Sequence, residues 1–168
     1  MAGKKKIVMI DDEADLCLLI KGNLEELGEF EVVTTTHPEE AISLCQRENP
    51  DLLLLDIVMP KMKGTEIVRS LKRKSETNHI PIIVISGLGE IVYFRKKGSW
   101  KWLPNRSVVM SRGEMIKERN HERAAELYCV EGYISKPFTT ERLLDLIRQV
   151  LRKSNLKENG KNTDFSLE

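Results

Sequence analysis

The sequence has few of the residues that would mark it as a secreted or cysteine-clustered protein. Aromatic residues make up 5% of its 168 residues. Its three cysteines lie far apart in the chain, at Cys17, Cys45 and Cys129. An odd number of separated cysteines argues against a disulfide framework and against a cysteine metal site. We therefore expect reduced thiols and a cytoplasmic protein.

A long apolar run is also absent. No stretch approaches the roughly 18 consecutive apolar residues that a membrane-spanning helix needs. A short apolar run at residues 7–10 follows three lysines, but Asp11 and Asp12 end it before it reaches the length of a signal peptide. We expect neither a signal peptide nor insertion into a membrane.

Neither sign of charge is in excess. Lysine and arginine total 27 and aspartate and glutamate total 26, which gives a formal net charge of +1. This balance argues against wholesale binding to nucleic acid or to a membrane surface. A length of 168 residues with 40% hydrophobic residues is typical of one domain with one core.

The sequence alternates between strand and helix patterns. Apolar runs predict strands over residues 6–10, 30–34, 52–55, 80–85 and 132–135. Apolar periodicity and caps predict helices over residues 14–27, 38–48, 65–74 and 139–151. The alternation predicts an α/β fold, a doubly wound five-stranded parallel sheet with helices on both faces.

Polar side chains follow the expected strands at the point where each one ends. Asp11 and Asp12 follow the first strand, Asp56 the third, Ser86 the fourth and Lys136 the fifth. In open α/β sheets, ligands bind outside the carboxyl ends of the strands, where the strand order reverses. If the first and third strands are neighbours, three carboxylates converge there, and their repulsion favours a bound cation. Oxygen ligands with room for water suit Mg²⁺.

The same residues carry a resemblance to a known family. The matching pieces, in chain order, are Asp11-Asp12, Asp56 with Met59-Pro60 and Gly64, Ser86, and Lys136-Pro137-Phe138. Over residues 6–90 and 121–152 the sequence resembles the receiver domain of two-component response regulators. The resemblance implies a flavodoxin-like sheet with strand order 2-1-3-4-5.

The resemblance also implies a role for each matching carboxylate. Asp56 would be the phosphoacceptor. Asp12 and Asp56, with the backbone carbonyl of Val58, would hold Mg²⁺, and Asp11 would act through the water of the ion. The chemistry is sensible on general grounds, because an aspartate can serve as a covalent nucleophile and a cation neutralises the phosphoryl oxygens.

Further roles are implied at the fourth and fifth strands. Lys136 would pair with the phosphoryl oxygens, and the Ser86 hydroxyl would reach one of them. Tyr133, three residues before Lys136, matches the aromatic residue that changes rotamer on activation. A sensor histidine kinase or phosphotransfer protein would donate the phosphoryl group, and the modification would switch the binding of a downstream protein partner. Such a chain is a signalling domain, not an enzyme beyond its own phosphotransfer and dephosphorylation.

Two other classes share part of this pattern. A haloacid-dehalogenase-type phosphatase also combines a strand-end aspartate, a Ser or Thr, a Lys and Mg²⁺. It needs a second acid two residues after the nucleophile, where this sequence has Val58. A receiver-like interaction module that never carries phosphate is the other class, and the intact set of acids with Ser86 and Lys136 argues against it.

The spacing departs from that of the family between Ser86 and Lys136. These residues are 50 positions apart, whereas the resemblance implies a little over twenty. We expect an insertion at about residues 91–120, within a receiver domain that spans residues 1–153. Residues 154–168 lack periodicity and are rich in Lys, Asn and Glu, so we expect a mobile C-terminal tail.

The inserted residues are basic and include both tryptophans. Residues 88–120 contain eight lysines and arginines against three glutamates, together with Trp100 and Trp102. A solvated loop, a docking patch for a protein and a nucleic-acid contact all fit this composition. The preference of binding hot spots for Trp and Arg favours the protein partner. A capping box at Ser111–Glu114 predicts a helix from there to about Tyr128.

Overall fold

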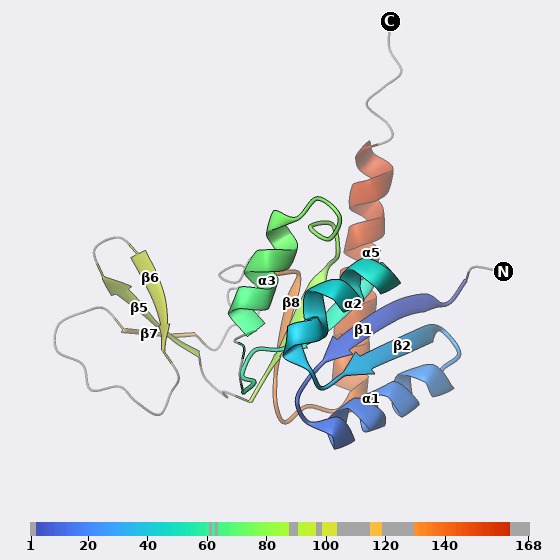
Figure 1. Ribbon diagram of the computed structural model, residues 1–168, viewed down its shortest axis with the longest axis horizontal. Coiled ribbons are helices and arrows are strands. Elements are labelled where there is room, and N and C mark those ends of the chain that lie inside the picture. The colour runs from blue at the N-terminus through green and yellow to red at the C-terminus, as the bar shows by residue number, and fades with distance from the viewer. Residues whose placement is uncertain are drawn as a thin grey trace, which may run out of the picture.

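The structure is a computed structural model that describes residues 3–60, 62, 64–87, 91–96, 99–103, 115–118 and 130–161. Five parallel strands form one sheet in the order β2-β1-β3-β4-β8 (Figure 1). The strands are β1 (Lys5–Ile10), β2 (Phe30–Thr35), β3 (Leu52–Asp56), β4 (Ile82–Ser86) and β8 (Gly132–Ser135). Because β8 is the fifth strand of the sequence prediction, the predicted order 2-1-3-4-5 is confirmed.

The helices lie between these strands and after the last one. They are α1 (Ala14–Glu26), α2 (Ala41–Glu48), α3 (Gly64–Arg73) and α5 (Thr140–Lys161), with a 3₁₀ helix η1 (Pro38–Glu40) before α2. Among the helices that the structure describes, none is long and apolar enough to cross a membrane. The helices predicted at residues 14–27 and 65–74 agree with the bounds of α1 and α3 to within a residue at each end.

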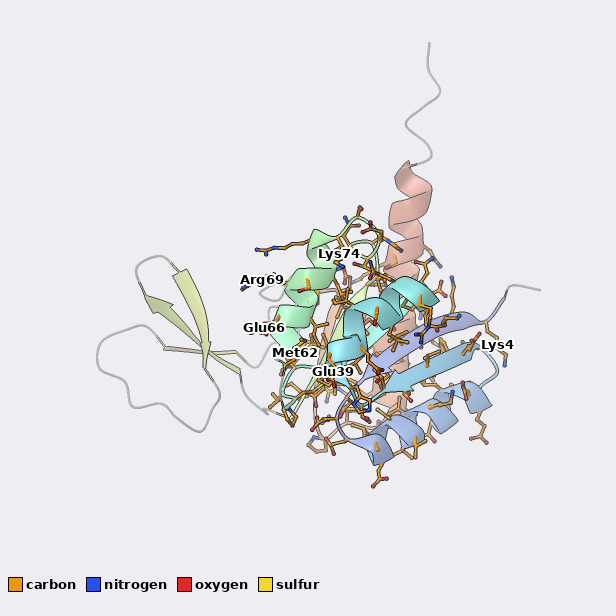
Figure 2. The ribbon with its side chains drawn as sticks, viewed as in Figure 1. Lys4, Glu39, Met62, Glu66, Arg69 and Lys74 are labelled. Carbon is orange, nitrogen blue, oxygen red and sulfur yellow. The ribbon has the colours of Figure 1, made fainter. Side chains whose placement is uncertain are left out.

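Helices cover both faces of the sheet. On one face, α2 and α3 pack against alternate residues of the central strands, and on the other face α1 and α5 pack against the residues between them. The helix α3 shows the pattern, because Ile67, Val68 and Leu71 are buried whereas Glu66 and Arg69 lie on its outer face (Figure 2). The predicted doubly wound arrangement is thus observed.

The central strand β3 explains why a covered parallel strand is apolar throughout. Leu53 and Leu55 belong to the core on the α2 and α3 face, and Leu52 and Leu54 belong to the core on the α1 and α5 face. All four are fully buried. Since successive side chains of a strand alternate between faces and both faces are covered, β3 has no solvent-facing position.

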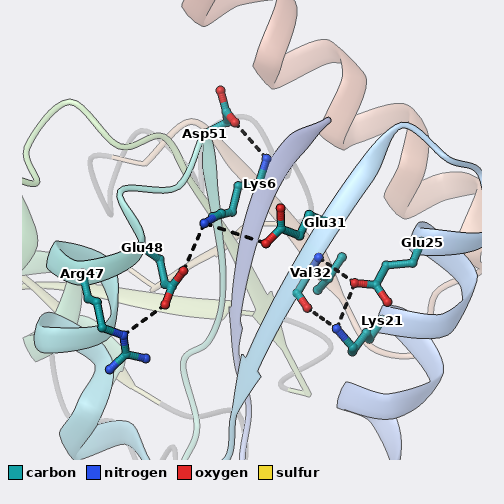
Figure 3. A network of polar contacts seen from close by, with 8 residues as sticks. All are labelled: Lys6, Lys21, Glu25, Glu31, Val32, Arg47, Glu48 and Asp51. Carbon is teal, nitrogen blue, oxygen red and sulfur yellow. Dashed lines mark hydrogen bonds and ion pairs between the residues drawn. The ribbon is translucent and has the colours of Figure 1, made fainter. Parts of the chain in front are cut away.

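The exposed edge strand β2 is protected by two side chains of α1. The Val32 N–H donates to Glu25 Oε1 at 3.0 Å, and the Val32 carbonyl accepts a hydrogen bond from Lys21 Nζ. Lys21 and Glu25 also pair with each other at 2.9 Å (Figure 3). Free backbone groups on an edge strand invite pairing with another chain, and this pair occupies them at Val32.

Ion pairs cover the amino ends of the strands. Lys5 Nζ lies 2.7 Å from Asp51 Oδ1, beside the start of β3. Lys6 Nζ lies 3.1 Å from Glu48 Oε2, and Arg47 Nε lies 3.0 Å from Glu48 Oε1 (Figure 3). Positive and negative side chains are therefore matched at this end of the sheet.

The residues that lie between β4 and β8 in the sequence form a second sheet. In it, β5 (Ile91–Lys96) pairs antiparallel with β6 (Ser99–Leu103) and with β7 (Met115–Glu118). The predicted helix that begins at Ser111–Glu114 is therefore wrong for residues 115–118. The β5 edge offers these residues backbone partners over a long sequence separation, and that pairing overrides the local capping signal. The remainder of the predicted helix lies outside the described residues.

The two tryptophans lie in β6. In the strand register, Trp100 pairs with Arg95 and Trp102 with Tyr93. The described part of the structure does not include their side chains, so their exposure and their role in partner binding stay predictions.

The helix α5 extends into the predicted tail, whose mobility stays a prediction. α5 continues to Lys161, through residues 154–161. No apolar stripe marks this extension, since Leu156 is 72% exposed. The added residues continue a helix that has already formed, which costs less free energy than starting a new one. Residues 162–168 lie outside the described residues.

Candidate functional site

Three carboxylates meet at the carboxyl edge of the sheet. Asp11 and Asp12 follow β1, and Asp56 ends the neighbouring strand β3. One carboxylate oxygen from each lies within 4.8 Å of the other two. The predicted convergence of these three residues is therefore observed, and it follows from the parallel pairing of the two strands.

Lys136 is the cation of this cluster. It follows β8, where its backbone N–H donates to the Ser86 carbonyl at 2.7 Å. Its Nζ lies 2.9 Å from Asp11 Oδ2 and 3.1 Å from Asp56 Oδ2. A lysine two strands away from Asp56 thus reaches the acceptor predicted for the phosphoryl group.

Glu13 completes the cluster, and the sequence analysis did not identify it. Lys136 Nζ lies 2.7 Å from Glu13 Oε1, the shortest of its three ion pairs. In the sequence, a third acid at the start of a helix has an ordinary explanation, since negative charge stabilises a helix N-terminus. Only the fold brings this residue to a lysine far along the chain.

Burial shifts the pKa values of the central groups. The side chain of Asp11 is 0% exposed and that of Asp56 is 5% exposed. Burial raises the pKa of both carboxyls, and the hydrogen bonds from Lys136 and from backbone N–H groups offset only part of the shift. Keeping these two carboxyls ionised therefore costs free energy, and a bound cation would lower that cost.

Lys136 stays charged although it is partly buried. Burial lowers its pKa, but hydrogen bonds to Glu13 and Asp11 and the charge of Asp56 together raise it above the ordinary lysine value. The ammonium therefore stays charged at neutral pH. Within the part of the chain that the structure describes, Lys136 is the one cation at a cluster of four carboxylates, those of Asp11, Asp12, Glu13 and Asp56.

The donor set fits a hard divalent cation. Asp11, Asp12 and Asp56 offer only oxygen atoms, and Asp12 is exposed, so that water can reach the cluster. Mg²⁺ prefers a few carboxylate oxygens and keeps several of its waters. Receiver domains generally bind Mg²⁺ at an acidic pocket of this kind.

The loop after β3 is held against Asp56. The Val58 N–H donates to Asp56 Oδ1 at 2.8 Å, so both oxygens of the carboxylate have a partner. The side chain of Val58 is 44% exposed and offers no titratable group. The hydrogen bond fixes the Val58 peptide beside the carboxylate, and the role of its carbonyl as a metal ligand stays a prediction.

Gly64 allows the start of α3 to approach this loop. A Cβ at this position would lie 2.5 Å from the Asp56 carbonyl oxygen and 2.7 Å from Ile57 Cα. The Gly64 N–H donates to the Ile57 carbonyl at 3.2 Å. Only glycine fits so close to backbone atoms, which explains the Gly64 of the sequence motif in physical terms.

Ser86 and Tyr133 lie on neighbouring strands beside the cluster. Ser86 ends β4 and is fully buried, and Tyr133 of β8 is 6% exposed within the core on the α2 and α3 face. Burial raises the pKa of the Tyr133 phenol, and a hydrogen bond with Ser86 lowers it. The two residues predicted as a switch are therefore in contact.

A shallow cavity lies next to Lys136. Its volume is about 230 Å³, and α1 and the segment after β8 line it, with Leu16, Leu19, Phe138 and Glu13 among its walls. Leu18 and Leu19 on α1 are 67% and 57% exposed. Apolar surface is thus available beside the cluster.

Comparisons with known proteins agree with this geometry. The family model described as "Response regulator receiver domain" matches residues 7–98. The polar-differentiation response regulator DivK of Brucella anthropi is 30% identical over 146 residues, which cover 87% of this chain and 96% of that protein. The probable transcriptional regulator ycf27 of Cyanophora paradoxa is 30% identical over 95% of this chain, which spans 56% of its length.

Solved structures share the fold. A CheY-like response regulator receiver domain protein from Methanospirillum hungatei JF-1 superposes with a TM-score of 0.66 at 20% identity, over 92% of this chain and 99% of that one. This chain spans only about half the length of the ycf27 regulators that it matches. It belongs to the response regulator receiver domain family of two-component signalling.

Proposed function

We propose that this chain accepts a phosphoryl group on Asp56 from the phosphohistidine of a sensor histidine kinase or of a phosphotransfer protein. The observation that carries the proposal is the position of Lys136 Nζ, 3.1 Å from Asp56 Oδ2, within a cluster of three carboxylates at the sheet edge. The phosphatase alternative has no support in this family, and its second acid is replaced by Val58.

In the proposed step, an oxygen of the Asp56 carboxylate attacks the phosphorus of the donor. The O–P bond forms as the N–P bond breaks, and the electron pair of the broken bond stays on the donor imidazole, which takes up a proton from solvent. Lys136 donates hydrogen bonds to the phosphoryl oxygens, and the Ser86 hydroxyl reaches one of them. Apart from this transfer and the later hydrolysis, the chain is a signalling protein and not an enzyme.

Mg²⁺ would be held by Asp12, Asp56 and the backbone carbonyl of Val58, with Asp11 acting through a bound water. When bound, the ion neutralises negative charge on the phosphoryl group and on the carboxylates. The support for this assignment is the all-oxygen donor set and the burial of Asp11 and Asp56.

The contact between Ser86 and Tyr133 supports a switch. A phosphoryl group that draws the Ser86 hydroxyl toward Asp56 removes it from Tyr133, and the phenol then adopts a second rotamer. The two arrangements differ at the surface beside β8, where a downstream protein binds. In this proposal, Trp100 and Trp102 of β6 contribute to that binding. The buried free thiols of Cys17 and Cys45 support a cytoplasmic setting.

The test is phosphorylation of the intact protein by acetyl phosphate with Mg²⁺, followed by mass spectrometry. The wild type should gain one phosphoryl group, and EDTA or Asp56→Asn should abolish the gain. Asp51→Asn is the matched control, because Asp51 precedes the same strand at its other end and should leave the gain unchanged. Absence of any phosphoryl gain in the wild type would favour an interaction module that never carries phosphate.

A further inference from the structure

The Lys136 ammonium has no donor to spare. Its three N–H groups face three carboxylate oxygens, at 2.7 Å from Glu13, 2.9 Å from Asp11 and 3.1 Å from Asp56. An ammonium group has only three hydrogens to donate. A phosphoryl oxygen can therefore bind Lys136 only when one of these carboxylates gives way.

Of the three partners, Glu13 is the one that can leave at least cost. Its side chain is 62% exposed, whereas those of Asp11 and Asp56 are 0% and 5% exposed. A released Glu13 carboxylate would be hydrated by water, but a released Asp11 would stay buried without its cation. Asp56 is the carboxylate to which the anion binds, so it stays at the site while the anion arrives.

The backbone position of Glu13 supports a role at the site and not in the helix. Glu13 is the N-cap residue of α1, but its side chain makes no capping hydrogen bond. Glutamate is not among the favoured N-cap residues, which accept a bond from the second or third helical N–H. Its carboxylate instead crosses to the segment after β8.

We propose that Glu13 is a positioning residue that competes with the phosphoryl group for Lys136 and so sets how readily the site takes up an anion. This inference rests on the proposed function of Asp56. Without the phosphoryl group, Glu13 holds one donor of Lys136. When the group arrives, Glu13 moves into solvent and its donor passes to a phosphoryl oxygen.

The negative charge of Glu13 also opposes binding of the phosphoryl group, as does its occupation of one Lys136 donor. Glu13 adds a fourth negative charge to a cluster that must admit a further anion. Removal of that charge should strengthen anion binding by roughly two- to fivefold, the range of a partly exposed ion pair. Because Glu13 is exposed, salt should reduce the difference in anion affinity between the wild type and a variant without this charge.

The experiment measures binding of beryllofluoride, a phosphoryl mimic, in the presence of Mg²⁺ by calorimetry, together with the rate of phosphorylation by acetyl phosphate. Glu13→Gln keeps the shape and an acceptor oxygen but removes the charge. Asp15→Asn is the matched control, because it removes an exposed charge from the first turn of the same helix and Lys136 has no ion pair with it among the described residues. Melting temperatures show that each variant is folded.

We expect Glu13→Gln to bind beryllofluoride roughly two- to fivefold more tightly than the wild type at low salt, with a gain that shrinks in about 0.5 M NaCl. Asp15→Asn should show a clearly smaller gain. Equal or weaker binding by Glu13→Gln, or an equal gain in both variants, would overturn the role of Glu13 alone. If neither the wild type nor Glu13→Gln binds beryllofluoride or takes up phosphate, the proposed function itself fails.

Discussion

The two ends of the five-stranded sheet handle charge in opposite ways. At the amino ends, Lys5 pairs with Asp51, and Lys6 pairs with Glu48 as Figure 3 shows; both ion pairs are partly exposed. At the carboxyl ends, Lys136 pairs with Asp11, Glu13 and Asp56, and Asp12 lies beside them without a second cation among the described residues; Asp11 and Asp56 are buried. The amino end pairs its charges near solvent, whereas the carboxyl end has more acids than cations among the described residues and buries two of those acids.

This difference shows where the fold gives up stability for function. Partly exposed ion pairs contribute little to stability because water and side-chain entropy oppose them. Buried carboxylates that outnumber the cations beside them destabilise the fold until a further cation binds. A bound cation would therefore stabilise the carboxyl end, whereas the charges of the amino end are already paired.

The largest effect is expected from a methyl group at the carboxyl end. Gly64→Ala would place a Cβ 2.5 Å from the Asp56 carbonyl oxygen, and backbone atoms must move to admit it. We expect a loss of about 1–3 kcal/mol in the free energy of unfolding. Gly22→Ala is the control, because nothing lies within 4 Å of its Cβ and α1 should gain about 0.5–1 kcal/mol. Urea unfolding followed by circular dichroism measures both, and equal effects would contradict the close approach.

Mg²⁺ should stabilise the carboxyl end and leave the amino end unaffected. At ten times its Kd, a ligand that binds only the native state adds about 1.4 kcal/mol to the free energy of unfolding. We expect this gain in the wild type and in Lys5→Ala, and its loss in Asp12→Asn. Thermal unfolding with and without Mg²⁺ gives the answer. A gain that persists in Asp12→Asn would place the ion elsewhere.

The amino end should tolerate loss of a charge. Lys5→Ala removes only the ion pair with Asp51, and we expect a change within about 1 kcal/mol. Asp51→Ala should cost more, since Asp51 Oδ2 also accepts the Lys6 N–H at 2.8 Å. Chemical unfolding of the two variants tests the order, and a larger loss for Lys5→Ala would contradict it.

The sequence could predict those parts of the molecule that local pattern determines. The unbroken run Leu52–Leu55 identifies a strand covered on both faces, and the acids and the lysine that follow the strands identify the edge where they meet. The strand order is correct because the resemblance to receiver domains implies it, and the convergence of Asp11, Asp12 and Asp56 follows from the first and third strands being neighbours. Four features were not predicted: Glu13 at the site, the strands at residues 99–103 and 115–118, and the extension of α5. Glu13 and the strand at residues 115–118 depend on contacts between distant residues.

The missed features show what local pattern cannot contain. Glu13 has the sequence signal of a helix N-terminus, and only the fold brings Lys136 to it. The capping box at Ser111–Glu114 predicts a helix, but Met115–Glu118 pairs with β5 in a sheet. The alternation of apolar and polar residues at 99–103 is a strand signal, but this segment was interpreted only by its basic and aromatic composition. The extension of α5 past residue 153 has no apolar stripe to announce it.

The most direct test of the difference between the two ends is the location of the phosphoryl group. Wild-type protein is treated with acetyl phosphate and Mg²⁺, reduced with borohydride to mark the acyl phosphate, digested, and mapped by peptide mass spectrometry. We predict one modified residue, Asp56, and no modification when EDTA replaces Mg²⁺. Modification at Asp51 or another aspartate, or unchanged modification of Asp56 in EDTA, would contradict the account.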